Sequence, residues 1–441
     1  MQRYTALATA VNHPDAINPY YGIFNYRILR SLSRAGTALD VVSPRPFTPP
    51  VGPYSAYSSI PDTEDWGPYT VHHPRFWYLL PKRFFYGVSG DSYADRVPAY
   101  VEQTFETPDV IHACHLYPDG YGMLSYARKH DVPLFVVAHG TLLNTLGDHP
   151  RGVDDKIRQT LSEADSVLCV SEALTAKAQR FTDPSKVETV PIGADPDTFP
   201  VERERHIRRE LDIPSEATVV LFVGAFTESK GVAEICAALP ELDRSRVDTS
   251  PATHSNSVTA TDNDSAATTN RDSETTTNRD SETTTYGDSE TSDTVFVFVG
   301  RDGELEEDLR QTVVESGFSD RYVYAGLPPL ALRRWYAVAD LLLLPSHSEG
   351  RPTVIYEAMA SETAVLASDV DGIPEQVADG ETGVLIPPGE VDALVDALDS
   401  LTGDRNRLNR MGKAGYERLL DKRWTWRDHA DRVQELHREA L

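Results

Sequence analysis

The chain is poor in cysteine and has no long apolar run. Cys114, Cys169 and Cys236 are an odd number at wide spacings, which argues for reduced thiols and a cytoplasmic protein. No stretch of about 18 apolar residues occurs, so the sequence predicts no membrane-spanning helix. The apolar start, residues 5–11, is short and has only Arg3 shortly before it. We therefore interpret it as a first strand rather than a signal peptide.

Basic residues are also scarce. The chain has 68 acidic and 42 basic residues in 441, a formal net charge of -26, and arginine supplies most of the positive charge. Nucleic acid is therefore not an expected partner, because its phosphates would be repelled. Acid excess with little lysine favours a salt-loving source, since concentrated salt shortens the Debye length to about 3 Å and suppresses self-repulsion. An ordinary acidic protein is the alternative.

Short apolar runs alternate with helix-like stretches along most of the chain. This pattern is typical of parallel sheets covered on both faces, in an α/β fold. The expected strands of the first half are residues 5–11, 39–43, 109–112, 134–138, 166–170 and 187–190. The expected strands of the second half are residues 219–224, 295–300, 321–325, 341–344 and 364–367.

Because the pattern restarts near residue 219, we expect two doubly wound, Rossmann-like domains facing each other across a cleft. The first would span residues 1–197 and the second residues 198–415. Residues 416–441 are expected to form a C-terminal helix that packs back towards the N-terminal domain. Such a pair of domains places its ligand between them, at the carboxyl ends of the strands.

Residues 244–293 break this pattern, because they are almost all Thr, Ser, Asp, Asn and Glu and contain a repeated octapeptide. With little apolar surface to bury, the segment is expected to be a disordered insertion. The alternative, an acidic interaction tract, lacks anchor residues. Deleting 246–292 should leave folding and catalysis intact, and a soluble deletion variant without activity would contradict this prediction.

The segment Glu349-Gly-Arg-Pro-Thr-Val-Ile-Tyr-Glu357 is the most informative one. It follows a buried strand, and Pro352 suits the first turn of a helix, whose free N–H groups attract phosphate. The two glutamates beside that site would accept hydrogen bonds from hydroxyls. A ligand with central phosphate and hydroxyl-rich rings at both ends is a nucleotide-sugar. The alternative is an ordinary strand, loop and helix with two solvated glutamates.

Four other segments support this interpretation: Tyr21-Gly22-Ile-Phe, Val137-Ala-His139-Gly, Val190-Pro-Ile-Gly-Ala-Asp195, and Val223-Gly224-Ala-Phe-Thr-Glu-Ser-Lys230-Gly. Together with the two glutamates, which have seven residues between them, they make the chain resemble the retaining glycosyltransferases of family 4, which have the GT-B fold. The resemblance covers nearly the whole length, apart from the insertion and much of 44–98.

The resemblance implies that the domain of residues 1–197 binds the acceptor and that the domain of residues 198–415 binds the nucleotide-sugar. It also implies roles for single residues. His139, Glu349 and Lys230 would be catalytic: His139 and Glu349 would orient the sugar, and Lys230 would stabilise the charge on the leaving phosphate. The donor would be bound by the following residues: Gly22, Gly224, Lys230, Arg351, Thr353, Val354 and Glu357. We expect no enzymic nucleophile, no metal and no cofactor.

Two residues depart from the family pattern, and the first is Ile192, which stands where the family has asparagine. The second is Ala225, which stands where the family has an arginine after the glycine of the fourth segment. Loss of that arginine should weaken diphosphate binding unless another cation compensates. We expect Arg351 to compensate in part.

Two further features concern the acceptor. His112-Ala-Cys114-His115 has metal-ligand residue types without a second ligand group, and the resemblance implies instead that His112 or His115 touches the acceptor. The aromatic-rich residues 44–98 form either a small satellite core or a surface for a glycan or lipid-linked acceptor, and Lys82 and Arg83 beside two phenylalanines would suit peripheral contact with a membrane.

The expected function is therefore transfer of a sugar from a nucleotide-diphosphate sugar to an acceptor hydroxyl with retention. A nucleotide-sugar 2-epimerase or a phosphorylase on the same fold, and a non-catalytic glycan- or nucleotide-binding relative, are the alternatives. Charge and family together suggest a haloarchaeal setting, such as surface glycosylation.

Overall fold

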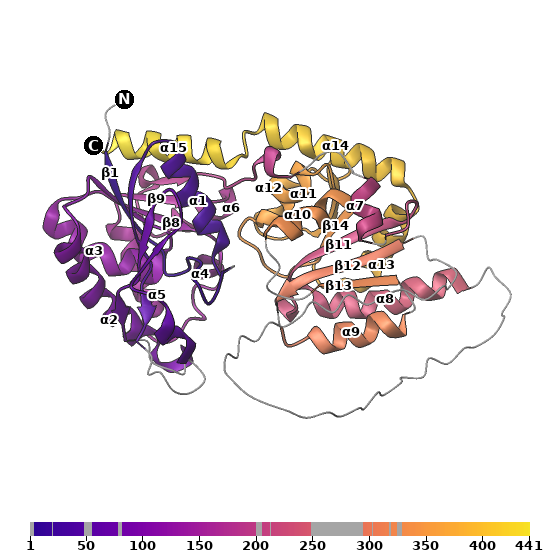
Figure 1. Cartoon of the computed structure of the whole chain (residues 1–441), viewed down its shortest axis with the longest axis horizontal. Coiled ribbons are helices and arrows are strands. Elements are labelled where there is room, and N and C mark those ends of the chain that lie inside the picture. Colours follow the sequence, from indigo (N-terminus) through magenta and orange to yellow (C-terminus); the bar gives the residue numbers. More distant parts are fainter. Residues whose placement is uncertain are drawn as a thin grey trace, which may run out of the picture.

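The computed structural model describes residues 4–19, 21–47, 55–77, 82–199, 205–211, 213–247, 294–301, 303–316, 319–323 and 329–441. Two α/β units, one from each half of the chain, lie side by side (Figure 1). The insertion expected at 244–293 falls outside the described residues from position 248 onward.

The first unit is built on an eight-stranded sheet with the order β10-β9-β8-β7-β1-β2-β5-β4, in which β4 alone is antiparallel among the described pairings. Its strands are β1 (Thr5–Thr9), β2 (Ala38–Val42), β4 (Thr63–Asp65), β5 (Thr70–His72), β7 (Val110–Ala113), β8 (Leu134–Ala138), β9 (Ser166–Cys169) and β10 (Val187–Thr189). Its central strands β7 and β8 are buried along their whole length, as a parallel sheet covered on both faces requires.

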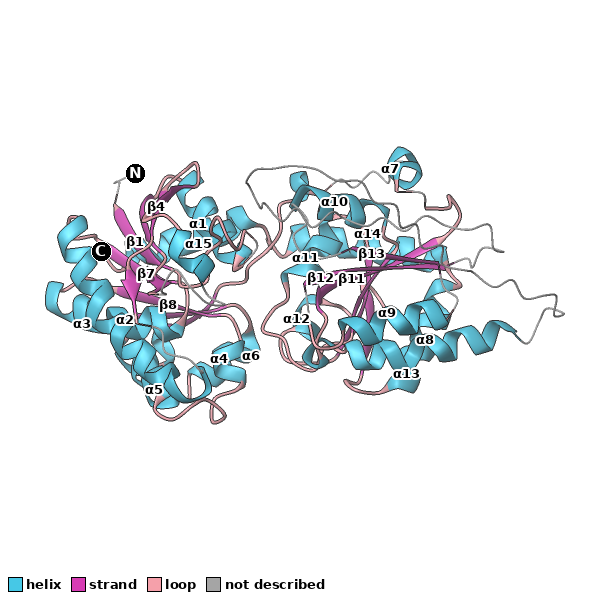
Figure 2. Ribbon diagram, turned by 60° about the horizontal axis from the view of Figure 1, so that its bottom comes forward, coloured by secondary structure: helices cyan, strands magenta, loops and turns pink. Residues whose placement is uncertain are grey.

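Helices cover both faces of this sheet (Figure 2). They are α1 (Ile23–Arg34), α2 (Lys82–Thr104), α3 (Tyr121–His130), α4 (Thr141–Asn144), α5 (Val153–Glu163) and α6 (Glu172–Ala178).

The second unit has a six-stranded parallel sheet with the order β13-β12-β11-β14-β15-β16. Its strands are β11 (Thr218–Ala225), β12 (Thr294–Arg301), β13 (Ser319–Val323), β14 (Leu341–Leu344), β15 (Ala364–Ser368) and β16 (Gly383–Ile386).

The helices of the second unit are α7 (Arg205–Glu210), α8 (Val232–Val247), α9 (Glu306–Glu315), α10 (Pro329–Val338), α11 (Thr353–Ala360), α12 (Ile373–Gln376), α13 (Val391–Thr402) and α14 (Arg405–Asp421). The α/β class with two doubly wound parallel sheets is thus confirmed. The domain boundaries set at 197 and 415 remain predictions.

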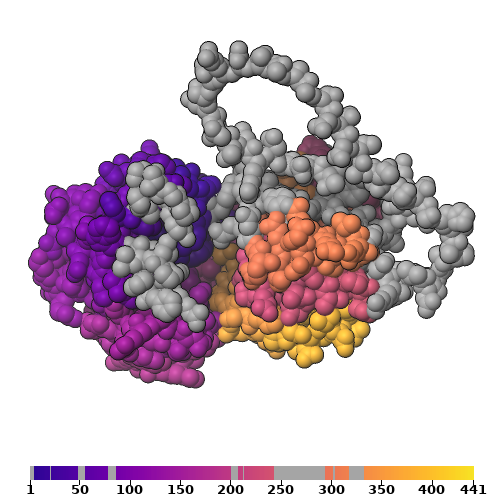
Figure 3. Space-filling model, turned by 90° about the horizontal axis from the view of Figure 1, so that it is seen from below, coloured from indigo at the N-terminus to yellow at the C-terminus, as the bar shows by residue number. Residues whose placement is uncertain are grey.

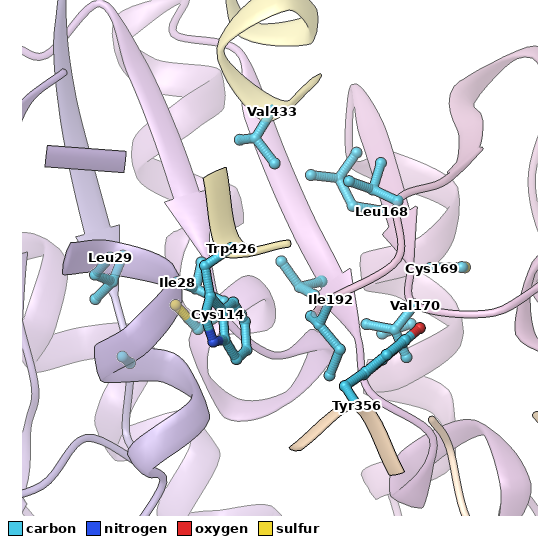
Figure 4. Packing of buried hydrophobic residues seen from close by; sticks show 14 of the residues in the cluster. Ile28, Leu29, Cys114, Leu168, Cys169, Val170, Ile192, Tyr356, Trp426 and Val433 are labelled. Atoms are coloured by element: carbon cyan, nitrogen blue, oxygen red, sulfur yellow. The ribbon is translucent and has the colours of Figure 1, made fainter. Parts of the chain in front are cut away.

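The last helix, α15 (Trp426–Glu439), lies against the first unit, and the C-terminus ends near the N-terminus (Figure 1). The Ser31 hydroxyl of α1 donates to the Trp426 carbonyl at 2.7 Å, and the side chain of His437 contacts the Tyr4 hydroxyl at 3.0 Å. Figure 4 shows Trp426 and Val433 of this helix among apolar side chains of the first unit. The helix therefore ties the end of the second unit to the first.

Residues 44–98 hold more regular structure than the sequence indicates. They contain the strands β4 and β5, a small sheet of β3 (Arg45–Pro46) and β6 (Arg75–Phe76), and the first part of α2. Trp66 packs against His13 and Tyr26, as a satellite core would, whereas Phe47 and Trp77 form an exposed pair with ring centroids 4.9 Å apart. The side chains of Lys82 and Arg83 lie outside the described residues.

The two units meet along one seam (Figure 3). The backbones of Gly140, after β8, and Gly350, after β14, touch there: a Cβ added to Gly350 would lie 1.8 Å from the His139 carbonyl oxygen. Only glycine permits this approach. The carboxyl ends of the two sheets therefore face each other, which is where α/β folds of this kind bind ligands.

Candidate active site

Glu349 lies at the seam, in the loop between β14 and α11. Its Oε1 accepts from Lys230 Nζ at 2.5 Å and from the Ser346 hydroxyl at 3.0 Å. Lys230 ends a short 3-10 turn, Glu228–Lys230, after β11. The loops after two neighbouring strands thus bring a carboxylate and a lysine together, as the sequence predicts.

Glu357 lies one turn inside α11 and is 3% exposed. Its carboxylate is paired with Arg27 of α1 and also receives the hydroxyl of Tyr336 on α10. Burial opposes the charge on Arg27, but the Glu357 carboxylate outweighs it and raises the pKa of Arg27. Glu357 is therefore a fixed hydrogen-bond acceptor rather than a solvated glutamate.

Helix α11 begins between the two glutamates. Pro352 precedes it with an extended backbone, and Thr353 and Val354 are its first residues. The first N–H groups of a helix have no partner within it, so they form an anion site together with the helix dipole. The hydrogen bond to Glu349 holds Lys230 beside this region. The ammonium group of Lys230 thus provides a cation for a diphosphate.

His139 directly follows β8 and lies beside Phe24 and His115, with ring centroids 4.8 and 5.3 Å away. Burial lowers the pKa of His139 well below its usual value, so the imidazole is neutral. Its Nε2 has no hydrogen-bond partner among the residues that the structure describes. A buried polar atom without a partner marks a position where a ligand hydroxyl fits.

The two expected glycines differ in how directly the structure explains them. Gly22 precedes α1 with a φ of 68°, and a Cβ there would lie 1.8 Å from the Asn12 carbonyl oxygen. The positive φ and the close approach of the Asn12 carbonyl therefore require glycine at position 22. Gly224 lies near the end of β11, where an added Cβ would come within 3.9 Å of the Lys230 side chain.

Arg351 does not lie where the sequence analysis expects it. Its guanidinium donates to Tyr356 and, at 2.6 Å, to Glu375, and it lies 4.8 Å from the centroid of the Trp424 ring. The side chain is 3% exposed. Arg351 is thus committed to these partners and does not replace the arginine missing at Ala225.

His112 and His115 have different surroundings. His112 is fully buried, with its Nδ1 3.3 Å from His437 of α15, and burial lowers its pKa to about 3. It therefore does not reach an acceptor. His115 instead lines a cavity of about 670 Å³ in the first unit, together with Gly22 and His139.

Several seam contacts have no signal in the sequence. Asn144 of α4 donates to the Glu349 carbonyl at 3.3 Å and to Asp371 at 3.1 Å. The Glu375 carboxylate accepts from the N–H groups of Glu172 and Ala173, both at 2.9 Å, at the start of α6. These partners lie 202 to 227 positions apart in the chain, so spacing could not reveal them.

Within the described residues, no helix is long and apolar enough to cross a membrane. The same residues contain no group of three His, Cys, Asp or Glu side chains placed to hold a metal ion.

Two known protein families match this chain. The family described as Glycosyltransferase Family 4 matches residues 22–198, and the family described as Glycosyl transferases group 1 matches residues 285–418. Between them they cover well over half of the chain.

Two curated proteins are similar in sequence. The teichuronic acid biosynthesis glycosyltransferase TuaC of Bacillus subtilis, which its name marks as putative, is 24% identical over 88% of this chain and 86% of its own length. The D-inositol 3-phosphate glycosyltransferase of Nocardia farcinica is 28% identical over 76% of this chain and 67% of its own length.

Two solved structures share the fold. Sucrose-phosphate synthase from Thermosynechococcus elongatus has a TM-score of 0.72 at 19% identity, over 99% of both chains. The Anabaena protein HepE in complex with UDP-glucose has a TM-score of 0.65 at 14% identity, over 98% of this chain and 99% of its own. The chain belongs to the glycosyltransferases of family 4 and is a nucleotide-sugar-dependent glycosyltransferase with the GT-B fold.

Proposed function

We propose that the seam binds the diphosphate of a nucleotide-sugar between Lys230 and the start of α11, and that the sugar is transferred to an acceptor hydroxyl with retention. The observation that carries this proposal is the contact between Lys230 and Glu349 beside the first N–H groups of α11. Lys230 and the N–H groups of Thr353 and Val354 stabilise the charge that develops on the leaving phosphate. Glu357 holds the ribose hydroxyls of the donor.

The sugar lies between the two units, near His139. A neutral imidazole with a free nitrogen is suited to accept a hydrogen bond from a sugar hydroxyl. Contact between Gly140 and Gly350 brings the two units together over the sugar and keeps water out, which limits hydrolysis of the donor. Gly22 and Gly224 complete the backbone walls of this site.

The acceptor enters from the first unit. A glycan or a lipid-linked saccharide is the proposed acceptor class, in keeping with the polymer-forming role in the name of the Bacillus relative. The exposed pair Phe47 and Trp77 supports a peripheral contact with the cytoplasmic face of a membrane. The charge of -26 supports function in concentrated salt, as in a haloarchaeal cytoplasm.

A panel of UDP-, GDP- and ADP-sugars, incubated with the protein in high and low salt, tests this function. The proposal expects one donor to raise the melting temperature and to release its nucleoside diphosphate when an acceptor is added, with the anomeric configuration retained in the product. Conversion of the donor without acceptor into its C2 epimer would instead support the epimerase. Absence of both binding and turnover across the panel would contradict the donor site.

A further inference from the structure

We infer that His115, held by the buried carboxylate of Asp119, receives a hydrogen bond from a hydroxyl of the acceptor, and that the acceptor ring bound there is an uncharged sugar. This inference rests on the proposed function, because it places the acceptor next to the sugar that His139 holds.

Asp119 fixes the orientation of the His115 ring. Its Oδ2 is 2.8 Å from His115 Nδ1, and its Oδ1 accepts from the Tyr93 hydroxyl at 2.8 Å and from the Val11 N–H at 2.9 Å. Asp119 is completely buried. An ionised carboxylate only accepts hydrogen bonds, so Nδ1 of His115 carries the proton.

The other ring nitrogen of His115 is consequently an acceptor. With Nδ1 protonated in a neutral ring, Nε2 presents a lone pair, and its one protein contact in the described structure is a long one of 3.5 Å to the Asn12 amide. The side chain is 11% exposed and lines the cavity of about 670 Å³. Because Nδ1 faces the buried carboxylate, the exposed edge is the one that carries Nε2.

The cavity lies beside the donor sugar. Its wall includes His139 and Gly140, and the rings of His115, His139 and Phe24 are neighbours, with centroids 4.8 to 6.1 Å apart. A group bound against His115 is therefore next to the residue that faces the transferred sugar. Its volume suits a sugar ring with further substituents.

The cavity has no charged side chain among the described residues that line it. Its polar groups are hydroxyls, an amide and the imidazoles of His115, His139 and His149, and its apolar surface includes Phe24, Phe76 and Leu142. Lys156 of α5 does not supply a charge, because its ammonium donates at 2.6 Å to both the Gly87 carbonyl and Asp91. A phosphorylated ring would meet no cation from the described part of the chain, and an uncompensated charge there is unfavourable.

Two substitutions of His115 separate this role from a structural one. In His115→Asn the shorter amide keeps a donor for Asp119 but loses the far nitrogen, whereas in His115→Gln the longer amide places an oxygen near the position of Nε2. If His115 only holds Asp119, the asparagine variant is the better enzyme. If His115 binds acceptor, the glutamine variant is the better one.

The probes are the methyl glycosides of glucose, galactose, mannose and N-acetylglucosamine, with glucose 6-phosphate as the charged probe and the preferred nucleotide-sugar as donor. We expect transfer to at least one neutral probe, about tenfold lower kcat/KM for that probe in His115→Asn, and a loss of threefold or less in His115→Gln. Hydrolysis of the donor without acceptor should stay within twofold of wild type in both. His130→Asn, on the outside of α3, is the matched control and should leave both rates unchanged.

Three results would overturn the inference while leaving the donor site intact: an asparagine variant that equals wild type, donor hydrolysis without transfer to any neutral probe, or transfer to the phosphorylated probe alone. Failure of the wild-type protein to hydrolyse or transfer any donor would instead count against the proposed function itself.

Discussion

At the scale of single residues, the two glutamates of the seam have different environments. Glu349 is 11% exposed and shares Lys230 with whatever ligand enters, whereas Glu357 is buried between Arg27 and Tyr336. A diphosphate must compete with Glu349 for Lys230, so this contact is expected to rearrange when donor binds. Arg27 comes from the other unit, which links the second glutamate to the closed arrangement.

Replacing Lys230 by methionine removes the cation and keeps most of the side-chain volume. We predict a fall in kcat of roughly 10²- to 10³-fold, because the leaving phosphate loses its point charge in a site sheltered from water. Steady-state transfer rates at saturating donor measure this effect. Lys129→Met, in an exposed pair with Glu102, is the control, and an equal loss in both variants would show a general effect of lost positive charge.

The sequence predicts some site residues and not others for physical reasons. Glu349, Glu357 and Lys230 lie in one strand-loop-helix pattern or at the end of one apolar run, so local spacing places them. Arg27, Asp371 and Glu375 act across the seam, and nothing near them in the chain indicates a partner. Arg351 was placed wrongly because a position near the helix start does not show which way a long side chain points.

At the scale of elements, the apolar runs located most strands of the two sheets but missed β4, β5 and β16. The strand β16 was missed because it is short and begins at Gly383, beside the glycine-containing turn before it. The helix α2 was missed because Gly87, Gly90 and Pro98 interrupt its pattern, although Pro98 lies inside the helix in the structure. In both elements tertiary packing outweighs the local sequence preference for another structure.

The contact between the loops after β8 and β14 gives a test of closure. Gly350→Ala adds a methyl group 1.8 Å from the His139 carbonyl oxygen, so the two units must move apart. We predict at least a tenfold loss of transfer activity. Donor binding, which depends on the second unit, should change little. Small-angle scattering with bound donor should show a larger radius of gyration than for wild type.

Gly403→Ala is the matched control, because a Cβ there meets its nearest atom at 3.3 Å, within its own turn after α13. It should transfer sugar at the wild-type rate. A Gly350→Ala variant with full activity would mean that catalysis does not need the two backbones in contact.

At the scale of the whole molecule, buried histidines make the fold sensitive to acid. Burial lowers the pKa of His13 and His112 to about 3 and of His429 to about 4, and lowers the pKa values of His139 and His437 well below the usual value. Three of them, His112, His429 and His437, lie where α15 meets the first unit. The folded protein therefore keeps these rings neutral where the unfolded chain would protonate them.

The sign of the effect follows from proton binding. Above pH of about 6.5 the rings are neutral in both the folded and the unfolded state, so the free energy of unfolding keeps its full value. Below that pH the rings of the unfolded chain bind protons, whereas those of the folded protein stay neutral, and the free energy of unfolding falls. Each ring should cost about 2 kcal/mol by pH 5, so we predict a steep fall in the urea midpoint between pH 7 and 5. The urea midpoints should be measured in about 1 M salt, because salt at that concentration screens the surface carboxylates. An unchanged midpoint at pH 5 would show that these rings accept protons in the folded state.

The account depends most on where the nucleoside diphosphate of the preferred donor binds, and a crystal structure of that complex tests it most directly. We predict the phosphates at hydrogen-bond distance, about 3 Å, from Lys230 and from the N–H groups of Thr353 and Val354, with the ribose hydroxyls on Glu357. A nucleotide bound inside the cavity around His115, or elsewhere away from Lys230 and Glu357, would contradict the assignment of the seam as the donor site.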